Sequence, residues 1–214
     1  MNECLLIDRH AGELRRAEDR FDGWALRWEP GEGGAADGAE PVGVVEAVRW
    51  LHARGPVRRV PVAVIGPKEA TAAHLATAEA LGAALAGIGL TLITGGRQGV
   101  MEAASRGAAR AGGLVIGLLP EDEWRAANDH VTVPLASGIG VARNALIARS
   151  AFALVAVGGG YGTLTEMAYG KHFDRTVLAL EDAPVVDGVP RCPSVEEAVV
   201  AVARAFLRLP ASSG

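Results

Sequence analysis

From about Val60 onward, short apolar runs alternate with longer segments whose apolar residues recur at helical spacing. The predicted strands are residues 62–65, 90–93, 114–118, 130–133, 152–157 and 176–180, and the predicted helices are residues 71–86, 98–111, 141–151, 163–172 and 194–207. Strands that are apolar throughout are buried on both faces, and their alternation with helices predicts a parallel sheet between helical layers. We therefore expect residues 60–214 to form a Rossmann-like, doubly wound α/β domain, which binds ligands beyond the carboxyl ends of its strands.

Residues 1–59 follow a different pattern. Short strand-like runs at residues 4–8 and 24–28 precede helical apolar spacing at residues 42–53, and the glycine-rich stretch at residues 30–38 indicates a flexible loop. This pattern predicts a small N-terminal α+β appendage to the main domain.

Composition narrows the classes of function. The chain has 214 residues, half of them hydrophobic, and a net charge of -4 without a basic stripe, so nucleic acid is not an expected partner. The apolar runs have strand length and no signal peptide is visible, so we expect a cytoplasmic protein without a membrane partner. The two cysteines, Cys4 and Cys192, lack metal-ligand spacing, and no metal site is expected.

Three predicted strands end in glycine-rich turns, at residues 65–68, 94–101 and 157–166. Glycine lets a ligand approach the main chain closely, and the N–H groups at the start of the following helix favour an anion. Long turns of this kind on one sheet predict a site for a phosphorylated small molecule. The turns match neither the Gly-x-Gly-x-x-Gly dinucleotide fingerprint nor a P-loop.

Charged residues near these turns have two interpretations each. Glu166 follows Thr163 at capping-box spacing, and it either caps a helix or orients a ligand hydroxyl and takes part in acid–base chemistry. Arg143 is either a solvated surface charge or a guanidinium fork for phosphate. Lys68, after the first strand, could supply a point charge to phosphate oxygens.

The segments at residues 94–101, 107–113 and 158–166 resemble motifs of the Lonely Guy superfamily, once labelled lysine decarboxylase-like. The last segment is similar to the family's Pro-Gly-Gly-x-Gly-Thr-x-x-Glu motif, with Gly158 in place of proline. Phosphoribohydrolases of the superfamily carry Met-x-x-Arg-Lys where this chain has Val-Ala-Arg-Asn, so Asn144 stands where lysine is expected. In this combination the chain looks more like the molybdenum-cofactor carrier branch and its uncharacterised bacterial relatives.

The resemblance implies one of two functions. The first is binding or carriage of a phosphorylated, nucleotide-like molecule such as the molybdenum cofactor. The alternative is cleavage of the N-glycosidic bond of a nucleoside 5′-monophosphate, with Arg143 and Glu166 as the catalytic pair. It also implies a homodimer or homotetramer. Lysine decarboxylation is rejected because it needs a pyridoxal-phosphate lysine, and Lys68 and Lys171 are the only lysines. The residues expected to bind the ligand are Gly66, Lys68, Gly95, Gly96, Gln98, Gly99, Val100, Met101, Arg143, Asn144, Gly158, Gly159, Gly160, Gly162, Thr163 and Glu166.

Overall fold

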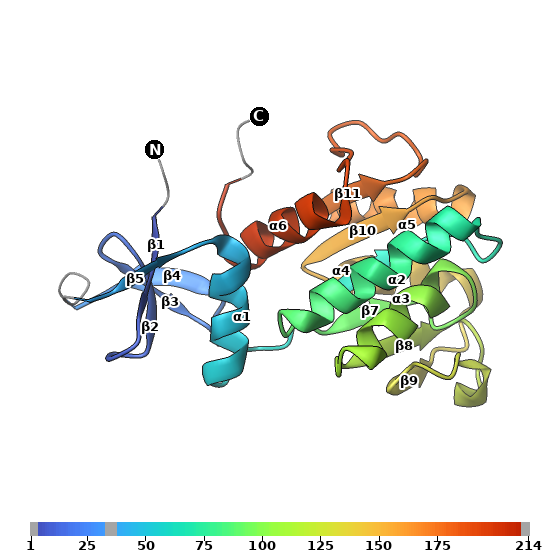
Figure 1. Ribbon diagram of the computed structural model, residues 1–214. Helices are drawn as coiled ribbons and strands as arrows, with labels where there is room; N and C mark the ends of the chain where they lie inside the picture. Colours follow the sequence, from blue (N-terminus) through green and yellow to red (C-terminus); the bar gives the residue numbers. More distant parts are fainter. Residues whose placement is uncertain (1–3, 33–37, 211–214) are drawn as a thin grey trace.

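The computed structural model describes residues 4–32 and 38–210 and contains two β-sheets (Figure 1). Within the glycine-rich stretch at residues 30–38, residues 33–37 lie outside the described residues, and with them most of the expected loop. One sheet is formed by the N-terminal part of the chain and the other by the part that follows Pro61. No helix within the described ranges is both long and apolar enough to cross a lipid bilayer.

The main sheet has six strands, and every pair of neighbouring strands is parallel. Its strands are β6 (Val62–Ile65), β7 (Leu92–Thr94), β8 (Val115–Leu119), β9 (Val133–Ala136), β10 (Ala153–Val157) and β11 (Thr176–Leu180). They lie in the order β11-β10-β6-β7-β8-β9. This topology confirms the predicted Rossmann-like class.

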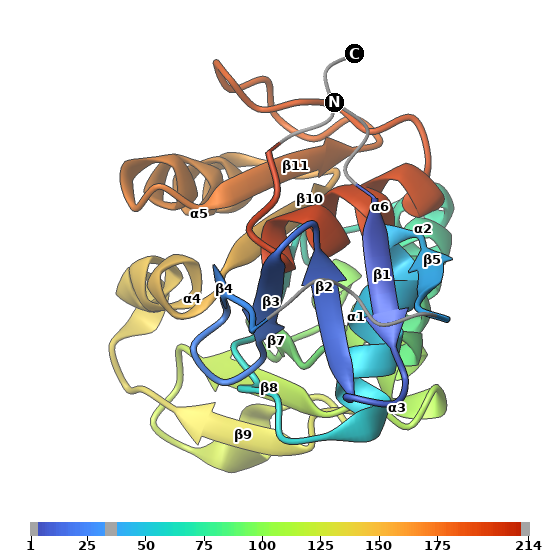
Figure 2. The same ribbon diagram turned by 90° about the vertical axis from the view of Figure 1, so that its left-hand side faces the viewer.

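Helices cover both faces of the main sheet because consecutive residues of a strand point to opposite faces. On one face, Val62 and Val64 belong to the apolar cluster that holds α2 (Ala72–Gly87), α3 (Val100–Arg110) and α6 (Val195–Phe206). On the other, Ala63 and Ile65 share a cluster with α4 (Asn144–Ser150) and α5 (Tyr161–His172). Figure 2 shows α4 and α5 on one side of the sheet and α2 and α6 on the other.

Strand β6 marks the point at which the order of strands reverses. The chain runs from β6 through β7 and β8 to β9, and then returns to β10 on the other side of β6. Parallel sheets bind ligands in the crevice that such a reversal opens at the carboxyl ends of the strands. The turns that begin at Gly66, after β6, and at Gly158, after β10, both lie at this crevice.

The N-terminal appendage is a five-stranded antiparallel sheet and one helix, which confirms the predicted α+β unit. Its elements are β1 (Leu5–Asp8), β2 (Glu13–Arg16), β3 (Asp19–Asp22), β4 (Arg27–Pro30), β5 (Glu40–Val42) and α1 (Val44–Arg54). Leu5, Ile7 and Leu14 belong to the same apolar cluster as Phe206 of α6. Trp28 donates a hydrogen bond from Nε1 to the Leu207 carbonyl oxygen, 2.7 Å away. The two sheets therefore share one core through α6.

The strand predicted at residues 24–28 is wrong in its first half. The Asp22 carboxylate accepts hydrogen bonds from the N–H groups of Trp24 and Ala25, which forms a turn, and Leu26 has a φ of 54°. Such local bonds compete with strand pairing, so β4 starts only at Arg27. The sequence did not predict β2 and β3, because their many charged residues obscure the alternation of apolar and polar positions, nor β5, which is only three residues long and contains Pro41.

Several further boundaries differ from the prediction. The strand expected at residues 130–133 begins only at Val133, because the Asn128 side-chain oxygen accepts the His130 N–H and holds a turn there. The helix expected from residue 98 begins at Val100, since Gly99 has a non-helical φ of 71°. The helix expected over residues 141–151 begins as a 3-10 turn, η2 (Gly140–Arg143), which continues into α4. A second 3-10 turn, η1 (Trp124–Ala126), precedes β9.

Candidate functional site

A cavity of about 310 Å³ lies at the carboxyl ends of β6 and β10, where the strand order reverses. Segments from four parts of the chain form its wall: the turn after β6, the turn after β7 with the start of α3, the η2–α4 junction, and the start of α5. The lining residues are Ile65, Gly66, Pro67, Lys68, Glu69, Gly95, Met101, Val141, Arg143, Asn144, Gly160, Gly162, Thr163 and Glu166.

An ion pair between Arg143 and Glu166 lies in the wall of this cavity. The Arg143 Nη1 is 3.2 Å from Glu166 Oε1, and the two residues are only 7% and 6% exposed. Arg143 is therefore not the solvated surface charge that one interpretation predicted. Its Nε is buried without a hydrogen-bond partner among the described residues. A buried donor left in this state is costly unless a further group satisfies it.

Burial sets the charge state of the pair. It raises the pKa of Glu166 to about 7, although the neighbouring Arg143 opposes this shift. Burial also lowers the pKa of the Arg143 guanidinium, against the attraction of Glu166. A guanidinium stays protonated in proteins. Near neutral pH, Glu166 is therefore partly protonated, and the charge of Arg143 is incompletely balanced.

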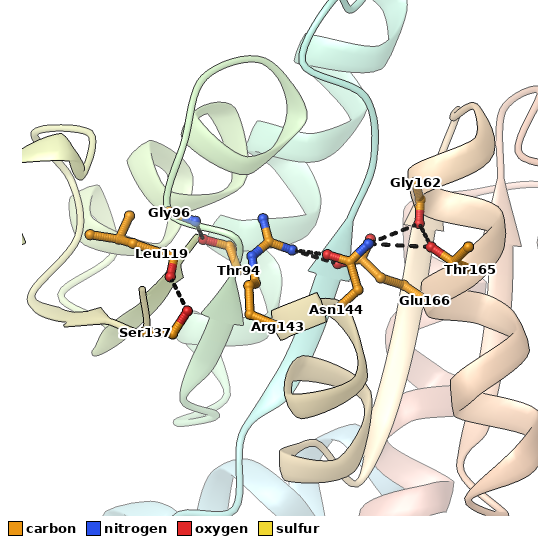
Figure 3. Close-up of polar contacts among 9 residues, drawn as sticks. All are labelled: Thr94, Gly96, Leu119, Ser137, Arg143, Asn144, Gly162, Thr165 and Glu166. Carbon is orange, nitrogen blue, oxygen red and sulfur yellow. Dashed lines mark hydrogen bonds and ion pairs between the residues drawn. The ribbon is translucent and has the colours of Figure 1, made fainter. Parts of the chain in front are cut away.

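Asn144 joins this ion pair to the start of α5 (Figure 3). Its side-chain oxygen accepts a hydrogen bond from Arg143 Nη1, and its Nδ2 donates to Thr165 Oγ1 over 3.3 Å and to the Gly162 carbonyl oxygen over 3.5 Å. The Thr165 hydroxyl also donates to the Gly162 carbonyl oxygen, 2.6 Å away. Asparagine thus holds the arginine through its side-chain oxygen, which a lysine at this position could not do because its ammonium group only donates.

Two glycines allow the turns to approach these groups. A side chain on Gly95 would overlap the Arg143 guanidinium and the Met101 sulfur, so the arginine lies directly on the main chain of the second turn. Gly99 has a φ of 71°, and a side chain there would overlap the Pro67 and Lys68 carbonyl groups. The first and second turns are therefore packed main chain against main chain, and the Val100 N–H donates to the Pro67 carbonyl oxygen.

Helix α5 begins on Gly160, without a side-chain cap. Its first helical hydrogen bond runs from the Leu164 N–H to the Gly160 carbonyl oxygen. No side chain in the described part of the chain accepts a hydrogen bond from the N–H groups of Tyr161, Gly162 or Thr163. Unsatisfied N–H groups at a helix start favour an anion, and this helix start lines the cavity.

Of the two interpretations of Glu166, the capping box with Thr163 is wrong. Because α5 begins two residues earlier than expected, Thr163 lies inside its first turn and the Glu166 carboxylate bonds to Arg143 instead. Glu166 is thus available for the chemistry of the cavity, which is the other interpretation of the sequence.

The cavity brings together ten of the sixteen residues expected to bind the ligand, namely Gly66, Lys68, Gly95, Met101, Arg143, Asn144, Gly160, Gly162, Thr163 and Glu166. The other six lie outside its lining and are Gly96, Gln98, Gly99, Val100, Gly158 and Gly159. Gly96 packs against Leu119, and Gly158 has a φ of 59° and lies against the His74 ring. The Gln98 side chain is exposed. Gly99 and Val100 belong to the second turn and the start of α3, but they do not line the cavity.

Sequence reasoning missed several residues of the site. Ile65, Pro67, Glu69 and Val141 also line the cavity, and Thr165 holds Asn144. Position at the reversal of strand order could have pointed to Pro67 and Glu69, which follow β6 directly. Behind the third turn, the His74 Nε2 lies 2.6 Å from Asp182 Oδ1, a contact between residues 108 positions apart that no local pattern reveals.

Comparisons with known proteins agree with this geometry. A model of the SLOG cluster4 family, which is related to Lonely Guy proteins, matches residues 59–203. An uncharacterized protein from Archaeoglobus fulgidus is 38% identical over 138 residues, which cover 64% of this chain and 91% of that protein.

Two solved structures are similar to the main domain. The molybdenum cofactor binding protein from the phototrophic bacterium Rippkaea orientalis has a TM-score of 0.65 and 33% identity, over 69% of this chain and 97% of that chain. The Moco carrier protein from Chlamydomonas reinhardtii has a TM-score of 0.65 and 33% identity, over 71% of this chain and 100% of that chain.

Proposed function

The chain belongs to the SLOG cluster4 family, and from that premise we propose that it binds a phosphorylated, nucleotide-like small molecule in the Arg143–Glu166 cavity and acts as a carrier. Membership confirms the resemblance to the Lonely Guy superfamily. The ligand we propose is the molybdenum cofactor, a phosphorylated pterin. Its support is the likeness of the main domain to a molybdenum cofactor binding protein and to a Moco carrier protein.

The observation that carries this proposal is the pairing of a buried, incompletely satisfied arginine with an uncapped helix start across one cavity. Arg143 offers Nε and a charge that Glu166 only partly balances. Helix α5 offers main-chain N–H groups and the positive end of its dipole. Both are favourable to a phosphate group. The cavity volume of about 310 Å³ lies at the lower end of the range of ligand sites, about 300–1,000 Å³.

The alternative function is hydrolysis of the N-glycosidic bond of a nucleoside 5′-monophosphate. Glu166 favours it, because a carboxyl group whose pKa is about 7 can take up and release a proton at neutral pH. The contact between Arg143 and Asn144 favours the carrier instead. It holds the guanidinium in place through a neutral side chain, where the phosphoribohydrolase motif has a second cation.

Titration calorimetry with AMP and adenosine, followed by an assay for ribose 5-phosphate, tests both functions. We expect AMP to bind more tightly than adenosine and no ribose 5-phosphate to form. Release of ribose 5-phosphate that Glu166→Gln abolishes would establish the hydrolase instead. Equal affinity for AMP and adenosine would overturn the phosphate site.

Pterin analysis tests the identity of the ligand. The protein is purified from cells that make the molybdenum cofactor, and the bound pterin is measured by fluorescence after oxidation. Arg143→Ala is expected to lose the pterin. The matched control Arg149→Ala is expected to keep it, because Arg149 is exposed on α4, the helix that follows Arg143, with its guanidinium over the Phe173 ring. Absence of pterin from the unmodified protein would contradict the proposed ligand. The AMP titration would then still test the phosphate site independently.

A further inference from the structure

A second and larger cavity, of about 600 Å³, lies along the β11 edge of the main sheet, away from the Arg143–Glu166 cavity. It is bounded by the end of α5, the first half of β11, the segment between β11 and α6, and α6 from Glu197 onward. Figure 2 shows β11 at one edge of the sheet, between α5 and α6. No residue lines both cavities.

Basic side chains dominate the rim of this cavity. Lys171, Arg175, Arg191 and Arg204 line it, against one acid, Glu197. Lys171 donates to the Gly188 carbonyl oxygen, and Arg175 donates to the Arg149 carbonyl oxygen. Within residues 4–32 and 38–210, no carboxylate forms an ion pair with Lys171, Arg175 or Arg191. Neutral carbonyl oxygens hold these groups in place but leave their positive charge uncompensated.

The wall of the cavity also contains hydrogen-bond donors. The Arg175 Nε is buried without a partner among the described residues. The main chain of Ala179 bonds outward to the segment 190–192, through its N–H to Pro190 and its carbonyl to Cys192. Residues two apart in a strand point their main-chain groups to the same side. The N–H of Val177 therefore faces the same free edge, where it lines the cavity.

The remaining wall is apolar. Leu178 of β11, Val200, Ala201 and Ala205 of α6, and Leu209 after it form this part. The cavity therefore has an apolar wall and a positively charged rim.

Part of this cavity lies outside the residues that the family model matches. The family model ends at residue 203, whereas Arg204, Ala205 and Leu209 follow it. The N-terminal appendage holds this last segment through the bond from Trp28 to the Leu207 carbonyl oxygen and through the packing of Phe21 on Phe206. The appendage thus supports one wall of the cavity.

We propose that the β11-edge cavity is a second ligand site, which takes a small amphipathic anion: an apolar body that carries a carboxylate or phosphate group. The anionic group lies among Lys171, Arg175 and the Val177 N–H, and the apolar body lies against α6. The volume falls within the range of ligand pockets, which are mostly apolar with a few polar groups that fix orientation. This site is independent of the function proposed for the Arg143–Glu166 cavity.

Titration calorimetry with octanoate, octyl phosphate and octan-1-ol tests the proposal. We expect at least one of the two anions to bind with a stoichiometry of one and at least tenfold more tightly than the alcohol. Which of the two binds more tightly identifies the head group. Absence of saturable anion binding at millimolar concentration, or equal affinity for the alcohol, would overturn the proposal.

Two variants locate the binding. Lys171→Gln with Arg175→Gln is expected to weaken anion binding at least tenfold and to leave the alcohol unaffected. Val200→Trp, at a position that is 40% exposed, is expected to fill the cavity and weaken all three ligands. The matched control is Arg49→Gln with Arg125→Gln, which removes two exposed arginine charges elsewhere and is expected to change nothing. Unchanged anion affinity in both cavity variants would overturn the proposal.

A cross-check separates this site from the first. AMP is not expected to displace the anion, and Arg143→Ala is expected to leave anion affinity unchanged. Displacement of the anion by AMP, or its loss in Arg143→Ala, would place the anion in the Arg143–Glu166 cavity and overturn the second site.

Discussion

Helices α2 and α6 begin in a different way from α3 and α5. Thr71 and Ser194 stand at the starts of α2 and α6, and their hydroxyl oxygens accept hydrogen bonds from the N–H groups of His74 and Glu197. Helices α3 and α5 begin on Gly99 and Gly160, which have no side chain to do so. All four helices follow strands of one sheet, or the segment after β11, so the difference does not come from topology.

The difference separates the capped starts of α2 and α6 from the uncapped start of α5, which lines the candidate ligand cavity. At α3, the Val100 N–H donates to the Pro67 carbonyl oxygen instead. A cap contributes about 1 kcal/mol to stability by satisfying N–H groups of the first turn. A helix start without a cap leaves those groups to solvent or to a ligand. Next to α5, the chain also buries an arginine whose Nε has no partner and a carboxyl group with a raised pKa. These groups around the Arg143–Glu166 cavity therefore lower the stability of the folded protein, whereas the capped starts of α2 and α6 raise it.

The largest expected effect is the loss of stability that results from burying the Glu166 carboxylate. Its pKa in the folded protein, about 7, lies above the ordinary value of 4.5, so the folded state binds more protons between these pH values. The free energy of unfolding should therefore fall as pH rises from 4.5 through 7. The difference between these two pKa values corresponds to about 3–4 kcal/mol. Glu166→Gln should remove this fall in denaturant titrations at several pH values.

The matched control is Glu123→Gln, because the Glu123 side chain is exposed and forms an ion pair with exposed Arg125. Its pH profile should follow that of the unmodified protein. Parallel pH profiles of the unfolding free energy for the unmodified protein and Glu166→Gln would show that burial of this carboxyl group does not lower stability.

The next effect concerns the arginine. Arg143→Ala should weaken AMP binding by about 1.5–3 kcal/mol, because charge-assisted hydrogen bonds contribute about that much. Adenosine binding should barely change. Calorimetry on Arg143→Ala and Arg149→Ala measures both ligands. A similar loss for AMP and adenosine would mean that Arg143 acts through the shape of the cavity and not on phosphate.

A cap introduced at α5 would convert one class of helix start into the other. Gly160 has an extended conformation, and open space surrounds the position of a side chain. Gly160→Asp should raise the free energy of unfolding by a few tenths of a kcal/mol (~0.3). It should weaken AMP binding about tenfold, ~1.4 kcal/mol, since its carboxylate occupies the N–H groups and repels phosphate. Gly160→Ala, which adds neither cap nor charge, controls for size, and equal AMP affinity in both variants would contradict this account.

The smallest effect is expected where caps already exist. Thr71→Ala and Ser194→Ala should each lower the free energy of unfolding by about 1 kcal/mol. Neither should change AMP affinity, because neither residue lines the Arg143–Glu166 cavity. Denaturant unfolding and calorimetry on the same samples check both statements. A loss of AMP affinity in Thr71→Ala would show that the start of α2 also belongs to the ligand site.

Most of the main sheet could be predicted from the sequence because its strands other than the edge strand β9 are largely buried on both faces and therefore apolar. The glycine turns were also visible, and they led to Gly95, Gly160 and Gly162 at the cavity. The contact between Arg143 and Glu166 was not visible from spacing, because it joins residues 23 positions apart, and only the resemblance to the Lonely Guy superfamily implied the pair. Spacing left Glu166 open between a capping box and a role at the ligand, and the start of α5 at Tyr161 rules out the capping box.

The appendage was harder to predict for a physical reason. Its strands are short and carry charges on one face, so β2 and β3 show few apolar residues. The β11-edge cavity left no sequence signal at all, because α5, β11, the segment before α6 and α6 itself each contribute only a few of its residues.

The bond between Trp28 and the Leu207 carbonyl joins residues 179 positions apart. During synthesis on the ribosome, the appendage emerges before the main domain, and α6, which completes the core of the appendage, emerges only after all the strands of the main sheet. Contacts of such long sequence separation form slowly, because the chain between them must first be ordered. The apolar face of the N-terminal sheet is therefore not fully covered until α6 has been synthesised. Early release of the chain before α6 would leave that face without its cover and favour aggregation.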